Sequence, residues 1–172
     1  MDFENGLLLD LNLQFFAEPT MLARDAIAGS QGSAYVTIAG NRYLFASLIN
    51  IEARWEKTKT QVPIMGSVSK GNKATGGEGT GSATFHYNTS IFRELMYQYQ
   101  ETGEDFYFDI QVSNDDKTST VGTQTTILKD CNIDGITIAM LDADADYLED
   151  TLDFTFEKFL LPQKFTNSPG MI

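Results

Sequence analysis

Apolar and polar side chains alternate along much of the chain from Ser33 onward. Successive side chains of a β-strand point to opposite faces, so a period of two predicts strands with one buried face. Short segments rich in Gly, Asn and Asp separate these runs and predict turns, as at 39–42 and 114–116. The expected strands are Ser33 to Ile38, Tyr43 to Gln61, Gly81 to Tyr87, Asp105 to Ser113, Thr123 to Leu128, Ile133 to Leu141 and Tyr147 to Leu160.

One segment, Ser90 to Gln100, has helical periodicity instead. Its apolar residues recur at the three- and four-residue spacing of a stripe that packs on a sheet. Asn88 or Thr89 is placed to cap its start, and Gly103 to end it. The stripe consists of Ile91, Phe92, Leu95, Met96 and Tyr99.

Strands far outnumber helices, which predicts a mostly β protein: a β-sandwich or split barrel of two packed antiparallel sheets with one α-helix. The 172 residues, 42% of them hydrophobic, suffice for a single domain, expected over residues 21–172. Residues 1–20 carry Asp2, Glu4 and Asp10 where an export signal needs positive charge. We interpret them as a poorly ordered leader or artificial extension ahead of a natural start at Met21, with a docking segment as the alternative.

Between two expected strands, Ile64 to Phe85 is crowded with glycine, serine and threonine and is too long for an ordinary hairpin turn. Its glycines could adopt positive φ. Ordering a backbone costs about 1–2 kcal/mol per residue, so we expect an arm at 62–82 that stays mobile in an isolated monomer. A ligand or another copy of the chain could order it.

The formal net charge is −12, from 12 Lys and Arg against 24 Asp and Glu. Nucleic-acid binding draws much of its affinity from cations that neutralise phosphates, so the chain is not expected to grip a phosphate backbone. The same charge suits a surface that nucleic acid passes without adhering. No apolar run approaches the roughly 20 residues of a membrane span, so no membrane partner is expected.

Asp142, Asp144 and Asp146 have the alternate spacing that begins a calcium loop, with Asp153 further on. An EF-hand needs glycine at the sixth position and glutamate at the twelfth, where this chain has Tyr147 and Asp153. The preferred interpretation is an exposed acidic turn, with no metal and no cofactor.

Catalytic residues are not expected either. The single cysteine, Cys131, and the single histidine, His86, allow neither a disulfide nor a zinc cluster, and Cys131 is expected to be a small buried side chain. His86 has no nucleophile motif beside it, and no Gly-Lys-Ser/Thr follows the glycine-rich segment. A hydrolase that uses carboxylates stays open, although no motif supports it.

Several short blocks carry a family resemblance. They are Pro63-Ile64-Met65-Gly66, Lys70-Gly71, Lys73, Thr75-Gly76, Gly79 to Phe85 and Thr89 to Phe92, followed by Leu141 to Asp144 and Phe154 to Glu157. Together they resemble the XkdM-type tail tube proteins of PBSX-like prophages and contractile phage tails, over roughly Ile27 to Lys164.

The resemblance implies a non-enzymatic structural protein of the virion tail, related in fold to the type VI secretion tube protein. Hexameric rings would stack into an inner tube through which DNA is ejected without specific binding, after assembly in the host cytoplasm. Tail sheath, baseplate and tail terminator proteins would be its partners. The expected inter-subunit assembly arm comprises Ile64, Met65, Gly66, Lys70, Gly71, Lys73, Thr75, Gly76, Gly77, Gly79 and Gly81.

An alternative function remains open at this point. The chain could be a monomeric β-sandwich binding module, with the arm as a ligand loop and a weak cation site at Asp142, Asp144 and Asp146.

Overall fold

The computed structural model describes residues 21–166, so the expectation for residues 1–20 lies outside the described residues. Seven antiparallel strands form one sheet in the order β2-β1-β5-β6-β7-β4-β3. A short 3-10 turn, η1 (Ala23–Asp25), precedes them, and the described residues hold one α-helix, α1 (Ile91–Thr102). The strands are β1 (Gly32–Ile38), β2 (Asn41–Leu44), β3 (Leu48–Val62), β4 (Gly71–His86), β5 (Phe108–Asp115), β6 (Thr123–Ile136) and β7 (Glu149–Gln163).

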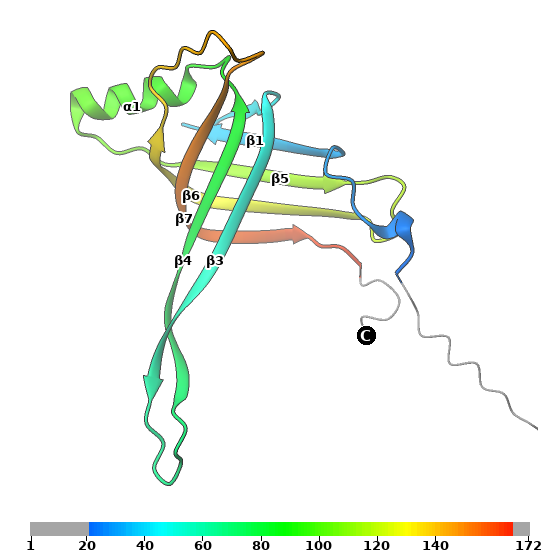
Figure 1. Cartoon of the computed structure of the whole chain (residues 1–172), viewed down its shortest axis with the longest axis vertical. Coiled ribbons are helices and arrows are strands. Elements are labelled where there is room, and N and C mark those ends of the chain that lie inside the picture. Colours follow the sequence, from blue (N-terminus) through cyan, green and yellow to red (C-terminus); the bar gives the residue numbers. More distant parts are fainter. Residues whose placement is uncertain (1–20, 167–172) are drawn as a thin grey trace, which may run out of the picture.

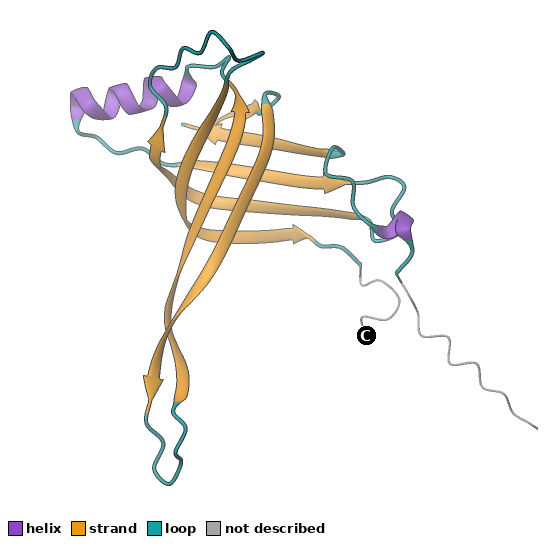
Figure 2. Cartoon of the chain, viewed as in Figure 1, coloured by secondary structure: helices purple, strands orange, loops and turns teal. Residues whose placement is uncertain are grey.

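The sheet curves strongly, so that β3 and β4 cross over β1, β5 and β6 (Figures 1 and 2). Strand β7 connects the two halves of the curved sheet, because it pairs with β4 along its first half and with β6 along most of its length. The expected mostly β, antiparallel class with one helix is confirmed. The two packed layers that the sequence predicts are the two halves of one hydrogen-bonded sheet.

The core lies between these two halves. Along β7, Leu152, Phe154 and Phe156 are buried while Asp153 and Thr155 are exposed, as the alternation predicts. The same inner surface receives buried side chains from β1, β4, β5 and β6, namely Ala34, Val36, Ala83, Phe85, Phe108, Ile110, Leu128, Cys131 and Ile133.

Helix α1 covers one end of the core through Phe92. The Phe92 ring packs against Phe45, Phe85 and Phe108, with centroid separations of 5.6, 5.8 and 5.9 Å. Of the expected stripe, Leu95 and Met96 also pack on the core, whereas Ile91 and Tyr99 are exposed. Gly103 ends the helix as predicted, with φ +71° and its N–H donating to the Tyr99 carbonyl.

Strand β6 corrects the predicted strand boundaries. The two runs expected at 123–128 and 133–141 form one strand, because a bulge around Asp130, whose φ is +55°, carries the chain between them in its pairing with β5. The strand then ends at Ile136, and residues 137–148 form the β6–β7 connection.

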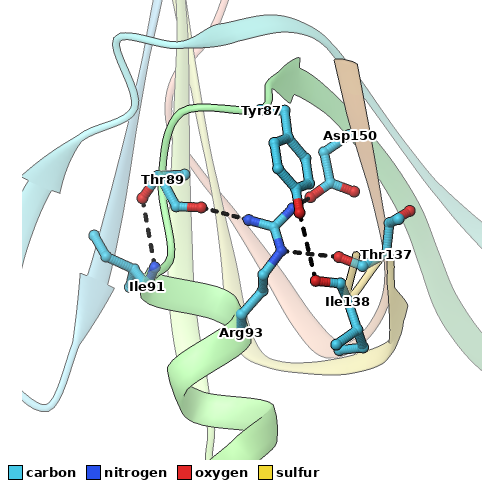
Figure 3. Close-up of polar contacts among 7 residues, drawn as sticks. All are labelled: Tyr87, Thr89, Ile91, Arg93, Thr137, Ile138 and Asp150. Atoms are coloured by element: carbon cyan, nitrogen blue, oxygen red, sulfur yellow. Dashed lines mark hydrogen bonds and ion pairs between the residues drawn. The ribbon is translucent and has the colours of Figure 1, made fainter. Parts of the chain in front are cut away.

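A partly buried cation holds this connection against the helix (Figure 3). Arg93 of α1 forms an ion pair with Asp150 at the start of β7. Its guanidinium also donates to the carbonyl oxygens of Thr89 at 2.5 Å and Thr137 at 2.9 Å, and lies over the Tyr87 ring. These contacts link the start of α1 to the ends of β6 and β4.

Candidate assembly interface

The hairpin of β3 and β4 projects beyond the rest of the sheet (Figure 1). The two strands pair from Leu48 opposite Phe85 out to Val62 opposite Gly71. Strand β7 accompanies β4 only as far as Gly79. Beyond that point the hairpin is two-stranded, and we call its residues 57–77 the distal arm.

The structure corrects the expected conformation of the segment 62–82, because residues 71–82 belong to a strand and not to a glycine-rich loop. Strand β4 begins at Gly71, so the loop spans only residues 63–70. Of the six glycines expected to exploit positive φ, only Gly66 does so, with φ +81°. The other five have strand geometry because β3, rich in strand-forming residues, supplies a backbone partner along the whole segment.

Gly79 and Gly81 are required by packing rather than by turn formation. A Cβ at Gly79 would lie 2.5 Å from the Phe156 ring, and one at Gly81 would lie 2.4 Å from the Phe154 ring. A Cβ at Gly77 would lie 2.9 Å from the Trp55 indole nitrogen. Aromatic rings therefore lie directly over the bare backbone of β4.

The sequence contains a signal for this packing that the interpretation as a loop overlooked. Glycines recur with a period of two at positions 77, 79 and 81, and phenylalanines do so at 154 and 156. Matching periods on two strands place glycines and rings on the same face once the strands pair. Trp55 extends the row, with centroid separations of 5.8 Å to Phe156 and 5.9 Å to Phe159.

The predicted arm residues therefore fall into two groups. Gly79 and Gly81 lie in the body of the sheet, beneath the aromatic rings. The other nine lie in the distal arm, either in the loop or in the two-stranded part of β4: Ile64, Met65, Gly66, Lys70, Gly71, Lys73, Thr75, Gly76 and Gly77.

The distal arm differs in charge from the rest of the protein. It contains Lys57, Lys59, Lys70 and Lys73 and no carboxylate, which gives it +4. The whole chain carries −12, so all other residues together carry −16. At its tip the side chains of Met65 and Val68 are fully exposed.

Beyond the backbone pairing of its two strands, the distal arm has few side-chain contacts. In the loop the Ser67 N–H donates to the Ile64 carbonyl at 3.1 Å, and the Ser67 hydroxyl lies 3.1 Å from the Ser69 hydroxyl. The Thr60 and Thr75 hydroxyls approach each other at 3.4 Å across the strands. An isolated two-stranded hairpin is marginally stable in water, so an arm of this kind gains from contacts outside its own chain.

The outer surface of β3, β4 and β7 is polar and mainly acidic, and we call it the hydroxyl–carboxylate face. Cross-strand pairing aligns Glu52 with Ser82 and Ser82 with Asp153. Its only cation, Arg54, is bound to Glu52 at 2.6 Å. The face comprises Glu52, Arg54, Glu56, Glu78, Thr80, Ser82, Asp153, Thr155 and Glu157.

The candidate cation residues do not come together. Asp142, Asp144 and Asp146 are exposed in the β6–β7 connection, where the Asp142 carboxylate accepts the Asp144 N–H at 3.0 Å. Asp153 lies apart from them on β7. Within residues 21–166 no group of three His, Cys, Asp or Glu side chains is arranged to hold a metal ion.

Cys131 and His86 have the surroundings of structural residues. Cys131 is fully buried, as predicted, and burial raises the pKa of its thiol to about 12 because the thiolate would lose its hydration. His86 ends β4 and contacts the Tyr147 ring edge-on at 5.6 Å.

Residues 19–163 match the model of a protein family described as phage tail tube protein. The chain belongs to the phage tail tube family. This tail tube protein is 40% identical over 146 residues to the phage-like element PBSX protein XkdM of Bacillus subtilis strain 168, covering 85% of this chain and 97% of that relative. It is 39% identical over the same length to the uncharacterised protein YqbM of that strain.

Solved structures show the same fold. The SPP1 tail tube superimposes with a TM-score of 0.58 at 9% identity, covering 82% of this tail tube protein and 81% of that chain. A chain of the PVC extracellular contractile injection system sheath–tube complex gives 0.59 at 10% identity, covering 81% and 92%. The family match shows a structural tail tube role rather than an enzymatic one, and these structures show the fold. Within residues 21–166 no helix has the length and apolar character needed to cross a membrane.

Proposed function

We propose that this tail tube protein assembles as hexameric rings that stack into the inner tube of a phage-type tail, and that DNA passes through the lumen during ejection. The observation that carries the proposal is the distal arm, a two-stranded hairpin projecting beyond the sheet that contains its base (Figure 1). Nearly all its residues are solvent-exposed. Contacts with neighbouring copies would offset the free-energy cost of ordering it.

Ring formation can use the edges of the sheet. Strands β2 and β3 are its two ends, and β3 has 15 residues. A long unpaired strand edge readily accepts another strand, and proteins usually protect such edges. Two different edges that join head to tail generate a ring when the rotation between copies closes. We infer that β3 contributes to such a side-to-side contact.

The hydroxyl–carboxylate face suits the lumen. Joining copies through β3 would continue this face from one subunit to the next around the ring. Carboxylates there would repel DNA phosphates within a Debye length of about 8 Å, and the single cation is already paired with Glu52. A lumen of this kind would let DNA slide without binding.

The expected partners follow from related assemblies. Structurally similar chains come from an anti-feeding prophage baseplate, a sheath–tube complex and a tube-terminating cap. We infer that this protein likewise meets baseplate, sheath and terminator proteins, and that assembly takes place in the host cytoplasm before incorporation into the virion.

The test is a shortened arm in a tail-assembly assay. Residues 59–75 would be replaced by Asn-Gly, which joins the paired residues Thr58 and Gly76 by a tight hairpin turn and leaves the body of the sheet intact. We expect a folded protein with an unfolding curve close to that of the unmodified chain, but no tubes by electron microscopy. Full-length tubes from the shortened variant would contradict the role of the arm, and end-on views without six-fold symmetry would contradict the hexamer.

A further inference from the structure

Opposite charges lie at opposite ends of the molecule. The distal arm forms one end of its longest axis, and the β6–β7 connection lies at the other (Figure 1). The arm carries four lysines and no carboxylate. Residues 137–149 carry Asp142, Asp144, Asp146 and Glu149 and no lysine or arginine.

Both ends also expose apolar side chains. On the arm these are Met65 and Val68, exposed to 102% and 108%. On the β6–β7 connection Leu141 is exposed to 95%, and Ile138 and Tyr147 are also exposed. Each end therefore combines an apolar patch with charge of one sign, the combination that an interface with an apolar centre and a charged rim requires.

The acidic connection lacks a charge partner within the described part of its own chain. Arg93 donates to the Thr137 carbonyl at the start of the connection, but its charge is matched by buried Asp150. The arm cannot supply the missing charge within one molecule, because it lies at the far end of the longest axis (Figure 1). A second copy, stacked in the same orientation, would bring arm and connection together.

We propose that the distal arm of one subunit docks on residues 137–149 of the subunit stacked against it, with the arm lysines facing Asp142, Asp144, Asp146 and Glu149 and with Met65 and Val68 covering Leu141. This inference rests on the proposed tube and names its axial contact. The two surfaces differ and lie at opposite ends, so the contact repeats without closing and builds a stack. It also opposes the mutual repulsion of bodies that carry −16 outside the arm.

Charge reversal tests the contact from each side. The arm variant combines Lys70→Glu with Lys73→Glu, and the connection variant combines Asp142→Lys with Asp144→Lys. All four side chains are exposed, so both variants should fold. We expect each variant to shorten mean tube length about tenfold or more by electron microscopy, and the two combined in one chain to restore it.

The matched control is Lys117→Glu with Lys164→Glu, which makes the same charge change at exposed sites outside the arm. We expect this control to form tubes of normal length, and raising salt to about 0.5 M to shorten the tubes of the unmodified protein. The axial contact would be overturned if both single-end variants formed tubes of normal length, or if the combined variant did not restore the tube length that they lose. Either outcome would leave the tube itself in place. Failure of the unmodified chain to enter any tube would instead overturn the proposed function.

Discussion

Arg93 of α1 is paired with Asp150 of β7, whose side chain is inaccessible to solvent (Figure 3). The guanidinium has further acceptors in two backbone carbonyls, whereas Oδ1 of Asp150 is buried without a hydrogen-bond partner. The carboxylate thus depends on Arg93 for compensation of its charge. A buried charge whose partner is removed is strongly destabilising, because it has neither water nor a counter-ion.

We therefore predict that Arg93→Ala lowers the free energy of unfolding by about 3–5 kcal/mol, measured by denaturant titration. The matched control is Arg54→Ala, which removes the exposed partner of Glu52 and should cost less than about 1 kcal/mol. Equal losses in the two variants would show that the pair with Asp150 has no special role.

The close packing between Gly81 and Phe154 predicts a second effect. Gly81→Ala would place a Cβ 2.4 Å from the Phe154 ring, and the resulting overpacking should destabilise the protein by about 1–3 kcal/mol. Gly76→Ala is the control, because a Cβ there meets nothing within 4 Å. Thermal unfolding of the two variants checks this, and a Gly81→Ala protein as stable as Gly76→Ala would contradict the packing.

Burial of Cys131 predicts a protected thiol. With a pKa of about 12, only about one molecule in ten thousand carries the thiolate at pH 8. We expect a disulfide reagent such as dithionitrobenzoate to modify the native protein far more slowly than the protein in guanidinium. Comparable rates in the two solutions would place the thiol at the surface instead.

Two carboxylates near η1 predict a loss of stability in acid. Hydrogen bonds from Thr120 to Asp25 and from Thr118 to Asp116 lower the pKa of each carboxyl below its ordinary value of 3.8. Because the folded-state pKa is the lower one, the stabilisation is present above about pH 4 and disappears as the pH falls through the folded-state value.

The expected result is a melting temperature that declines below about pH 4, with a smaller decline in Thr118→Val and Thr120→Val. These variants remove the hydroxyl donors to Asp116 and Asp25 at similar side-chain volume. Identical pH profiles for the variants and the unmodified protein would mean that other groups cause the acid sensitivity.

Local patterns along the chain were sufficient for the fold class. Alternation from Leu152 to Phe156 predicts which side chains of β7 are buried, since the period of a strand requires only neighbouring residues. The sequence likewise predicts that α1 ends at Gly103, because the residue after the helix adopts a left-handed backbone conformation that favours glycine. Composition also sets residues 62–82 apart from their surroundings, and the loop at 63–70 lies within that segment.

Only the tertiary structure determined what the arm is. Composition indicated a loop, but β3 provides a partner for β4, and the rings of Phe154 and Phe156 need bare backbone at Gly81 and Gly79. The ion pair of Arg93 with Asp150 likewise joins residues far apart in sequence. The basic arm and the acidic connection lie at opposite ends of the molecule only because of the way the chain folds. Such relationships depend on which strands become neighbours and how far the sheet curves, and that is set by the packing of the whole chain rather than by any single segment.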